Sequence, residues 1–332
     1  MVEDLFVPSA TCPEPCDHPL NRTYDSSNSS TYLEHGGYAS SKWAGMTFTG
    51  TLSYDTVHLG DSDVSTFLFE EWTSSSCYSI GCLGFGYDGV LGLASPWSVH
   101  HEHRPNILRT LLSQKTLDEP IFSLKLPIRI DEEGEILFGA RNPKLNSSAL
   151  IDLPVVNGTR APFSSSWNVP ASKISFASPR PLEVTLPSNT IAVLDSGDPY
   201  LMLPDAMARN LTAAIGAIPG PAWFHHIPCE RRQELPLLTF TLDGHDFSIS
   251  AFEYTLEINL PEYPRMCITT FMSTEEFAFP RDLDLIVLGS PFLRGFYSVW
   301  NFEEGKVGRK YCGFLPACCV IANRGTIVAK LK

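Results

Sequence analysis

The residues best suited to chemistry follow an apolar stretch in the second half of the chain. Residues 192–194 read Ala-Val-Leu and run directly into Asp195, Ser196 and Gly197. An apolar strand that ends in this triplet presents a carboxylate at the strand end, and the small residues after it permit a tight turn. A second carboxylate facing Asp195 across one water would split the two pKa values, because two like charges resist ionising together. The pattern therefore predicts general acid–base chemistry on a water molecule, with Asp195 as one member of the pair.

An internal repeat distinguishes Asp195 from an ordinary turn residue, which would otherwise be the simpler interpretation. Residues 5–8, Leu-Phe-Val-Pro, resemble residues 201–204, Leu-Met-Leu-Pro. Each motif is followed by an apolar stretch that ends in Leu-Gly, at 91–92 and at 288–289. From proline to glycine the interval is 84 positions (92 minus 8) in the first half and 85 (289 minus 204) in the second. Two halves with the same marks at the same spacing predict a duplicated, two-lobed architecture.

Short β-like stretches dominate the elements that must position these residues. Apolar or alternating runs, separated by Gly, Pro and Asp, predict strands at 47–54, 122–126, 136–138, 238–242 and 285–288. Helical spacing of apolar residues occurs at 106–117 and 204–218. We therefore expect a mostly-β fold. The expected parts are a first lobe over 1–155 that is incomplete at its start, a second lobe over 156–311, and a C-terminal extension of unknown role over 312–332.

Composition and charge exclude several classes of protein. The chain has 332 residues, 43% of them hydrophobic and 18% charged, which is enough apolar material for one large domain or two of ordinary size. A formal net charge of -13 argues against binding to nucleic acid. No stretch approaches the ~18 consecutive apolar residues of a membrane span. The amino end lacks the residue order of a signal peptide. His100, His101 and His103 lie close together, but without an HExxH motif we expect no metal site.

Cysteines and glycosylation sequons indicate an oxidising, secretory environment. The chain has nine cysteines, at Cys12, Cys16, Cys77, Cys82, Cys229, Cys267, Cys312, Cys318 and Cys319. The absence of a CxxC motif argues against a zinc ribbon or a thioredoxin-type site. Five Asn-x-Ser/Thr sequons predict N-glycosylation at Asn21, Asn28, Asn146, Asn157 and Asn210. Paired cysteines together with sequons favour a secreted protein.

Several motifs, in order along the chain, resemble those of the pepsin-like aspartic proteases, peptidase family A1, over roughly residues 4–311. Residues 195–204 resemble the second catalytic motif of this family. Residues 88–94 and 286–300 resemble its conserved turns in the two lobes, and residues 43–57 resemble its flap hairpin. Each motif alone is common, whereas together and at duplicated spacing they are specific. The resemblance implies a mostly-β, bilobal fold with a substrate cleft between two pseudo-symmetric lobes.

The resemblance also implies an activity and a set of site residues. The family's activity is hydrolysis of peptide bonds at acidic pH by a water held between two aspartates, with no metal or cofactor. Asp195 corresponds to one of these aspartates, Ser196, Gly197 and Asp198 to the turn that follows it, and Trp43 to the flap residue. The implied protein is a monomeric, secreted or vacuolar glycoprotein of the fungal secreted type, with a polypeptide substrate, no nucleic-acid partner and no membrane span.

The family pattern further implies disulfides Cys12–Cys16 and Cys229–Cys267. A Cys77–Cys82 bridge is equally compatible with the sequence and stays open, as do the partners of Cys312, Cys318 and Cys319. The bridge with the longer loop should contribute more stability.

Three departures from the family pattern bear on activity. Asp195 precedes Leu201 by six positions, and the same offset from Leu5 gives position -1 (5 minus 6), so the printed chain is expected to be N-terminally truncated and to lack the first catalytic aspartate. Trp43 stands where the family has a tyrosine, which would enlarge the lid over the cleft. Asp198 stands where a serine or threonine is usual, and its charge is expected to raise the pKa of Asp195.

Two other functions remain open on the sequence alone. A protease-like binding protein, or a pseudogene product, would keep the cleft without the chemistry. An in-frame Asp-Thr-Gly or Asp-Ser-Gly upstream of residue 1 would favour the protease. A carbohydrate hydrolase would also use two carboxylates, but no further motif in the chain supports that function.

Overall fold

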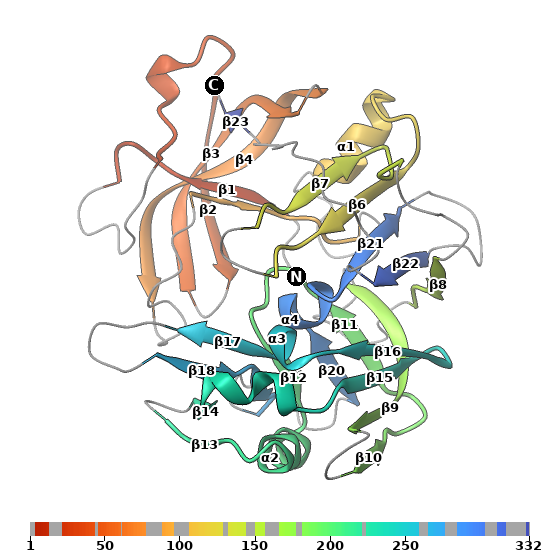
Figure 1. The fold of residues 1–332 in the computed structure, drawn as a ribbon. Coiled ribbons are helices and arrows are strands. Elements are labelled where there is room, and N and C mark those ends of the chain that lie inside the picture. Colours follow the sequence, from red (N-terminus) through yellow and green to blue (C-terminus); the bar gives the residue numbers. More distant parts are fainter. Residues whose placement is uncertain are drawn as a thin grey trace. The chain divides into compact units, whose positions relative to one another are not determined.

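Figure 1 shows a computed structural model of the chain, which forms two compact units. Unit 1 comprises Met1–Pro120 with Ile327–Lys332, and unit 2 comprises Ile121–Thr326. Strands predominate in both units, which confirms the predicted mostly-β fold. The structure describes residues 4–12, 22–43, 46–60, 62–77, 88–95, 106–128, 132–143, 150–156, 166–176, 181–220, 224–258, 265–275, 284–302, 311–316 and 330–331.

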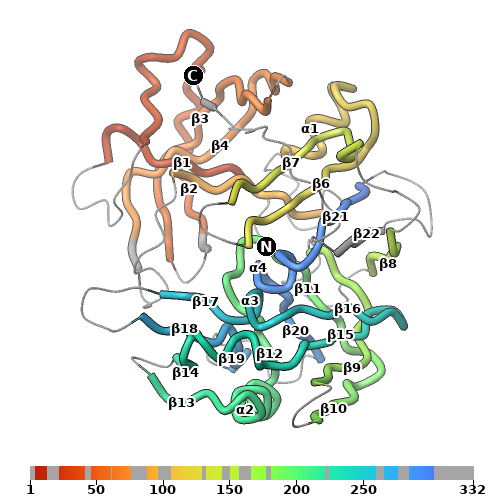
Figure 2. Tube along the Cα trace, viewed as in Figure 1, coloured from red at the N-terminus to blue at the C-terminus, as the bar shows by residue number. Residues whose placement is uncertain are grey.

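Unit 1 is built on one sheet with the strand order β2-β3-β4-β1-β5. These strands are β1 (Leu5–Pro8), β2 (Leu33–Trp43), β3 (Met46–Leu59), β4 (Ser62–Cys77) and β5 (Val90–Leu91). Along β3 the buried residues alternate for the most part with more exposed ones, as expected for a strand with one face on a core. Figure 2 shows β1, β2, β3 and β4 grouped together in red to orange. A short strand near the carboxyl end, β23 (Lys330–Leu331), pairs with β3.

The helical elements of unit 1 have local sequence causes. The short 3-10 helix η1 (Ser26–Asn28) is capped by the Asp25 side chain, which accepts from the Ser27 N–H. Helix α1 (Ile107–Gln114) begins after Asn106, whose side chain accepts from two backbone N–H groups of the first turn. Its apolar face is buried, and the helix ends where Lys115 adopts a left-handed conformation.

The largest sheet of unit 2 has the strand order β16-β15-β9-β11-β20-β12-β19, with β10 pairing on β9. The strands are β9 (Trp167–Phe176), β10 (Leu182–Thr185), β11 (Ile191–Leu194), β12 (Leu201–Leu203), β15 (Leu238–Leu242), β16 (His245–Ile249), β19 (Phe271–Ser273) and β20 (Leu285–Leu288). β11 lies between β9 and β20, and β20 lies between β11 and β12. This sheet holds the predicted catalytic strand in its interior.

Within the described residues, unit 2 also contains two further sheets and four helical segments. One sheet has the order β13-β14-β18-β17, with β13 (Ile218–Pro219), β14 (His225–Ile227), β17 (Thr255–Ile258) and β18 (Met266–Thr269). The other has the order β7-β6-β21-β22-β8, with β6 (Ile121–Lys125), β7 (Glu135–Phe138), β8 (Ile151–Pro154), β21 (Phe296–Asn301) and β22 (Tyr311–Pro316). The helices among the described residues are α2 (Asp205–Ala214), η4 (Cys229–Glu234), α3 (Ala251–Tyr254) and α4 (Ser290–Leu293).

The internal repeat is visible in the strand pairing. In unit 1, β1 pairs antiparallel with β5, with Leu5 opposite Leu91, and parallel with β4. In unit 2, β12 pairs antiparallel with β20, with Leu201 opposite Leu288, and parallel with β19. In each unit, the strand that ends at or just before the repeated proline pairs antiparallel with the strand that runs into the repeated Leu-Gly, and parallel with a third strand. The repeated motifs of the sequence therefore form the same three-stranded arrangement in both units. This confirms the predicted duplication at the level of topology.

The predicted strands all form, with bounds that shift by a few residues, and both predicted helices form as well. The helix predicted over 204–218 ends earlier, at Ala214, and Ile218 belongs to β13. Gly216 has a φ of 66° and the Ala217 N–H donates to the Thr212 carbonyl, which is the hydrogen bond of a glycine-terminated helix end. The sequence contained this stop signal at Gly216, and the predicted range extended two residues beyond it, to 218.

The compact units divide at Pro120 rather than near residue 155. The reason is the sheet of β6, β7, β8, β21 and β22, which unites residues 121–154 with residues 296–316. The first residues of the predicted extension, 312–316, lie within β22 of this sheet. Lobes over 1–155 and 156–311, which were defined by the repeat, stay a prediction. In the described part of the chain, no helix has the length and apolar character needed to cross a membrane.

Candidate active site

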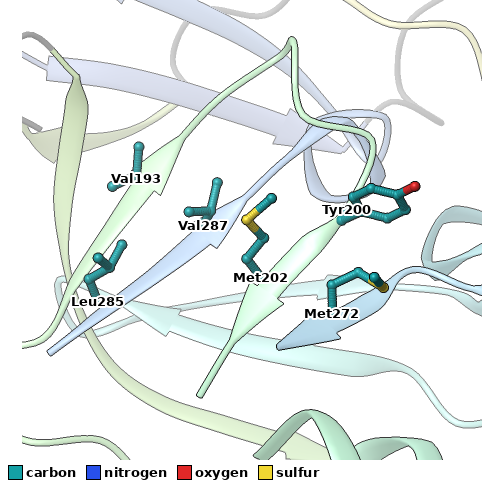
Figure 3. Close-up of a cluster of buried hydrophobic side chains, with 6 residues drawn as sticks. All are labelled: Val193, Tyr200, Met202, Met272, Leu285 and Val287. Carbon is teal, nitrogen blue, oxygen red and sulfur yellow. The ribbon is translucent and has the colours of Figure 1, made fainter. Parts of the chain in front are cut away.

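Asp195 follows a strand that is fixed on both sides. β11 pairs parallel with β20 and antiparallel with β9, and Ala192, Val193 and Leu194 are each at most 1% exposed. Figure 3 shows Val193 in a buried cluster with side chains from β12, β19 and β20. The members of this cluster are Val193, Tyr200, Met202, Met272, Leu285 and Val287. Burial on this scale leaves the carboxyl end of β11 little freedom, so the backbone of Asp195 is held in place.

The turn after β11 is closed by its own hydrogen bonds. The Gly197 N–H donates to Asp195 Oδ1 at 3.0 Å, and the Asp198 N–H donates to the Asp195 carbonyl at 3.2 Å. The Tyr200 N–H donates to Asp198 Oδ1 at 2.9 Å. Asp195 is half-buried, and Ser196 and Gly197 are exposed. The predicted role of the small residues, which is to bring a backbone N–H group to the carboxylate, is what the geometry of Gly197 and Asp195 provides.

A glycine of the second motif fastens this turn to β20. The Asp195 N–H donates to the Leu288 carbonyl, the Gly289 N–H to the Tyr200 carbonyl, and the Ser290 N–H to the Asp198 carbonyl at 2.7 Å. A Cβ atom on Gly289 would lie 2.3 Å from the carbonyl oxygens of both Asp198 and Tyr200. Because backbone atoms cannot yield as a flexible side chain can, only glycine fits this position. The sequence marked Gly289 as part of the repeat but gave no hint of this close approach.

Asp198 is a titratable group beside the predicted catalytic residue. Burial and the neighbouring charge of Asp195 raise the pKa of Asp198 to about 7, although the hydrogen bond from the Tyr200 N–H acts in the opposite direction. Below that pH, Asp198 is a neutral carboxylic acid. The raised pKa thus belongs to Asp198 itself, and the expected effect of Asp198 on Asp195 stays a prediction.

The predicted flap forms a hairpin in unit 1. β2 and β3 pair antiparallel, with Trp43 opposite Met46 at the end of the pairing. The backbone of Trp43 closes β2, and its side chain lies outside the described residues. A Cβ atom on Gly50 of β3 would lie 2.0 Å from the Glu71 carbonyl oxygen, so β3 and β4 approach closely at a shift of register. The hairpin exists as predicted, and the lid role of Trp43 stays a prediction.

One predicted disulfide is present, and the pairing predicted for Cys12 stays a prediction. Cys229 and Cys267 are bonded, with Cα atoms 5.1 Å apart, and they join η4 to β18. Cys12 is also disulfide-bonded, while its predicted partner Cys16 lies outside the described residues. Cys77 ends β4, and Cys82 lies outside the described part.

Two of the five sequon asparagines are in the described part, and both are exposed. Asn28 ends η1, where its side chain donates to Asp25 Oδ2 at 2.6 Å, and Asn210 lies on α2. The other sequon asparagines and the histidine group lie outside the described residues; they are Asn21, Asn146, Asn157, His100, His101 and His103.

Sequence reasoning missed a set of buried carboxylates in unit 1. Glu71 accepts from Ser9 at 2.6 Å and from Ser53 at 3.2 Å. Glu70, which is 1% exposed, accepts from Ser41 at 2.5 Å. The signal was present in the sequence, since this Glu-Glu pair interrupts the apolar run Phe-Leu-Phe-Glu-Glu-Trp at 67–72. The run reads as a buried strand, and acidic residues inside such a strand need hydroxyl partners.

Comparison with known proteins agrees with this geometry. The sequence profile of the eukaryotic aspartyl proteases matches residues 3–310. The chain belongs to the eukaryotic aspartyl protease family. This membership supports a bilobal architecture for the mostly-β fold, and the catalytic role of Asp195 stays a prediction.

Individual aspartyl proteases are similar along most of the chain. "Vacuolar protease A" of Aspergillus fumigatus is 32% identical over 309 residues, which are 92% of this chain and 72% of that protein. "Probable vacuolar protease A" of Trichophyton verrucosum is 31% identical over 311 residues, covering 92% and 72%. "Cathepsin D" of Chionodraco hamatus is 27% identical over 310 residues, covering 92% and 74%.

Proposed function

We propose that this protein is an aspartic endopeptidase that uses Asp195 as one of two catalytic carboxylates. The observation that supports this role is the placement of Asp195 at the end of a buried strand, in a turn fastened by Gly289 and Ser290. In the reaction, one carboxylate takes a proton from water, the water oxygen adds to the peptide carbonyl carbon, and the other carboxyl group gives its proton to the carbonyl oxygen. The proton taken from water then passes to the amide nitrogen as the C–N bond breaks, and a proton of the diol returns to the second carboxylate. The substrate is a polypeptide, and the expected pH of action is acidic.

Asp198 fits this chemistry in its neutral form. With a pKa of about 7, Asp198 is protonated at acidic pH, so its hydroxyl group is a hydrogen-bond donor like the serine or threonine that the family uses there. Once the pH approaches 7, Asp198 gains a negative charge next to Asp195. That charge opposes ionisation of the pair, so it should hold the basic limb of the pH–rate profile at higher pH than a threonine would. The basic limb of the pH–rate profile of an Asp198→Thr enzyme should therefore lie at lower pH than that of the parent enzyme.

The printed chain should turn over little or no substrate by itself. By the repeat, the carboxylate equivalent to Asp195 falls at position -1, before the first printed residue. A carboxylate pair acts as a unit, so one member alone gives almost no catalysis. We therefore propose that activity requires a second carboxylate supplied from outside residues 1–332.

The names of similar proteins and the disulfide support a proposed location. Vacuolar protease A and cathepsin D are the names of similar proteins, and the Cys229–Cys267 disulfide requires an oxidising compartment. We propose a vacuolar or secreted glycoprotein, with Asn28 and Asn210 as exposed acceptor sites.

The test is a chain extended upstream with a strand that ends in Asp-Thr-Gly, assayed on an unfolded protein substrate at acidic pH. The expected result is turnover that pepstatin inhibits and that falls at least about 1000-fold in Asp195→Asn. The control is an Asp243→Asn variant, since Asp243 lies in an exposed turn of the β15–β16 hairpin. An extended chain that folds, binds pepstatin and shows no turnover would favour the non-catalytic binding protein instead.

A further inference from the structure

The two glycosylation sequons in the described part of the chain place their hydroxyl groups differently. In the sequon at 210–212 the asparagine is exposed, whereas Thr212 is only 7% exposed. The Thr212 hydroxyl donates to the Ala208 carbonyl at 2.7 Å. In the sequon at 28–30, both the asparagine and the serine are exposed. The first sequon therefore buries the hydroxyl group that defines it, and the second presents that group to solvent.

The helix α2 is the cause of this burial. The sequon 210–212 lies within α2, and Thr212 belongs to the buried face of this helix together with Met207, Ala208 and Leu211. Residues two positions apart on an α-helix point about 200° apart around the axis, so they do not face each other. The Asn-x-Ser/Thr motif requires that the modifying enzyme recognise the asparagine and the hydroxyl residue together. While α2 is intact, one enzyme site cannot contact both groups.

The sequon at 28–30 has no such obstacle. Asn28 is the last residue of η1, and the backbone of Ser29 is already extended, with φ -102° and ψ 127°. The Asn28 side chain donates to Asp25 Oδ2, but this hydrogen bond is exposed, so water competes with it and breaking it costs little. The folded unit 1 therefore leaves both groups of this sequon open to an enzyme.

The order of synthesis leaves α2 unsupported for a time. The helix has ten residues, and a helix of this length is marginal in water without a packing partner. It packs against β10, β12 and β19 in unit 2, and β19 ends at Ser273, which is 61 positions (273 minus 212) after the sequon. At about 5–20 residues per second, those positions take roughly 3–12 s to synthesise. During that interval the sequon at 210–212 is able to adopt an extended, readable form.

We propose that Asn210 is an N-glycosylation site that is modified only before α2 folds, whereas Asn28 is open to modification before and after folding. In the transfer, the Asn210 amide nitrogen loses a proton and bonds to the anomeric carbon of the sugar, whose bond to the phosphate of the lipid-linked donor breaks. The glycan is compatible with the folded unit, because Asn210 lies on the exposed face of α2. The inference rests on the proposed secretory location, since the chain meets the enzyme there.

The test uses two full-length chains that each keep one sequon. One chain keeps Asn210 and carries Asn28→Gln, while the other keeps Asn28 and carries Asn210→Gln. Ser30→Thr in the second chain makes the hydroxyl residues of the two sequons alike. Both chains also carry changes at the remaining sequons, which are Asn21→Gln, Asn146→Gln and Asn157→Gln.

Each chain is modified in two ways, and the mass shift of the product measures the extent. In the first arm, the chain is fused to a cleavable signal peptide and translated into microsomes, so that the enzyme acts during synthesis. In the second arm, the folded and unglycosylated protein receives solubilised oligosaccharyltransferase and lipid-linked oligosaccharide. Both chains should be modified in the first arm. In the second, the Asn28 chain should react at least about tenfold faster than the Asn210 chain.

Two results would overturn the proposal. One is a folded Asn210 chain that reacts within about threefold of the folded Asn28 chain, because α2 would then not block the enzyme. The other is a microsome arm in which Asn28 is modified and Asn210 is not. Neither arm measures proteolysis, so a chain without protease activity gives the same answer. A natural protein without glycans, with both arms as expected, would count against the proposed location and leave the difference between the sequons intact.

A variant of the helix shows whether α2 is the barrier. Met207→Ala removes packing from the buried face of α2 without touching the sequon, so it should speed modification of the folded Asn210 chain at least about threefold. Ala206→Gln, at an exposed position of the same helix, is the control and should leave the rate unchanged. No acceleration in a folded Met207→Ala chain would refute the role of α2. If that variant fails to fold, the comparison of the two parent chains still decides.

Discussion

The two units contain the same three-stranded arrangement but fill it with different chemistry. Opposite Phe6 of β1 stands Glu70, and opposite the equivalent Met202 of β12 stands Met272. Glu70 is 1% exposed and Met272 is 4% exposed, so a carboxylate and a thioether occupy matching interior positions. The duplicated feature is the hydrogen-bonded framework. The side chains within it have diverged, with hydroxyl-bound carboxylates in unit 1 and apolar packing in unit 2.

The two units differ also in the protonation state that stabilises a buried carboxylate. In unit 1 burial opposes ionisation of Asp55, but hydroxyl groups of Thr31 and Tyr24 hold its pKa below the usual range. In unit 2 burial and a like charge raise the pKa of Asp198. One buried carboxylate therefore stabilises its unit when ionised, and the other when neutral. Four variants test how the stability of the two units differs.

The largest effect should come from opening the disulfide of unit 2. A Cys229→Ser, Cys267→Ser chain should lose about 4 kcal/mol of unfolding free energy, because the bridge closes a loop of 38 residues. Hydrogen exchange reads the two units separately, through the amides of β18 and those of β3. Faster exchange in β18 with β3 unchanged is the expected pattern. Equal acceleration in both would show that the two units unfold together.

Gly289→Ala should cost unit 2 at least about 3 kcal/mol, because the new Cβ would collide with two carbonyl oxygens. The control is Gly244→Ala, where φ is 80° but no atom lies within 4 Å of the added Cβ. That change should cost only about 1 kcal/mol, the strain of a left-handed alanine. Urea unfolding of the two variants gives the comparison, and similar losses would mean that the close approach at Gly289 is not limiting.

Tyr24→Phe should destabilise unit 1 by about 2 kcal/mol near neutral pH, because it removes a 2.5 Å hydrogen bond to the buried Asp55 carboxylate. A lowered pKa contributes stability above the ordinary aspartate value, and that contribution is lost as the pH falls through the folded pKa. The variant and the parent should thus converge in acid. Tyr38→Phe is the control, since Tyr38 is 75% exposed. A difference that persisted unchanged below about pH 2 would contradict the assignment to Asp55.

Asp198→Asn should stabilise unit 2 by about 1 kcal/mol above pH 7, after allowance for partial access to solvent. The raised pKa means that the folded parent holds its proton until about pH 7, so its stability falls as the pH rises from the ordinary aspartate value to about 7. Asparagine stays neutral and keeps the acceptor for the Tyr200 N–H. Thermal unfolding between about pH 4 and 8 gives the slope. Asp195→Asn should reduce that slope, since the charge of Asp195 is one of its causes.

Much of the framework could be predicted from the sequence, because it is encoded locally. Strand periodicity, the stop signal at Gly216 and the spacing of the two repeated motifs all lie in short stretches of sequence. The disulfide of Cys229 with Cys267 followed from family resemblance. Periodicity alone would not have paired these cysteines.

The residues of the candidate site could be predicted from the sequence, whereas the hydrogen bonds that hold them in place could not. Asp195 and its turn were identified from the triplet and the repeat. The hydrogen bonds that fasten that turn to Gly289 and Ser290 span 89 positions (289 minus 200) and 92 positions (290 minus 198), so they leave no pattern in the residues around Asp195. Glu70 and Glu71 had a local signal, an acidic pair inside an apolar run, but their serine partners lie elsewhere in the chain and could not be identified from that run.

The sheet that joins β6 to β21 affects how the protein can fold while it is being synthesised. Ser298 donates to the Leu124 carbonyl across 174 positions of sequence, and β22 pairs on the far side of β21. During synthesis, β6, β7 and β8 leave the ribosome long before their partners exist, and a strand with an open edge is prone to pair with other chains. The early strands of unit 2 therefore stay incompletely paired until β21 and β22 have been synthesised, whereas most strands of unit 1 can already pair. Nascent chains should be most vulnerable to aggregation, and most dependent on chaperones, between the synthesis of residues 154 and 316.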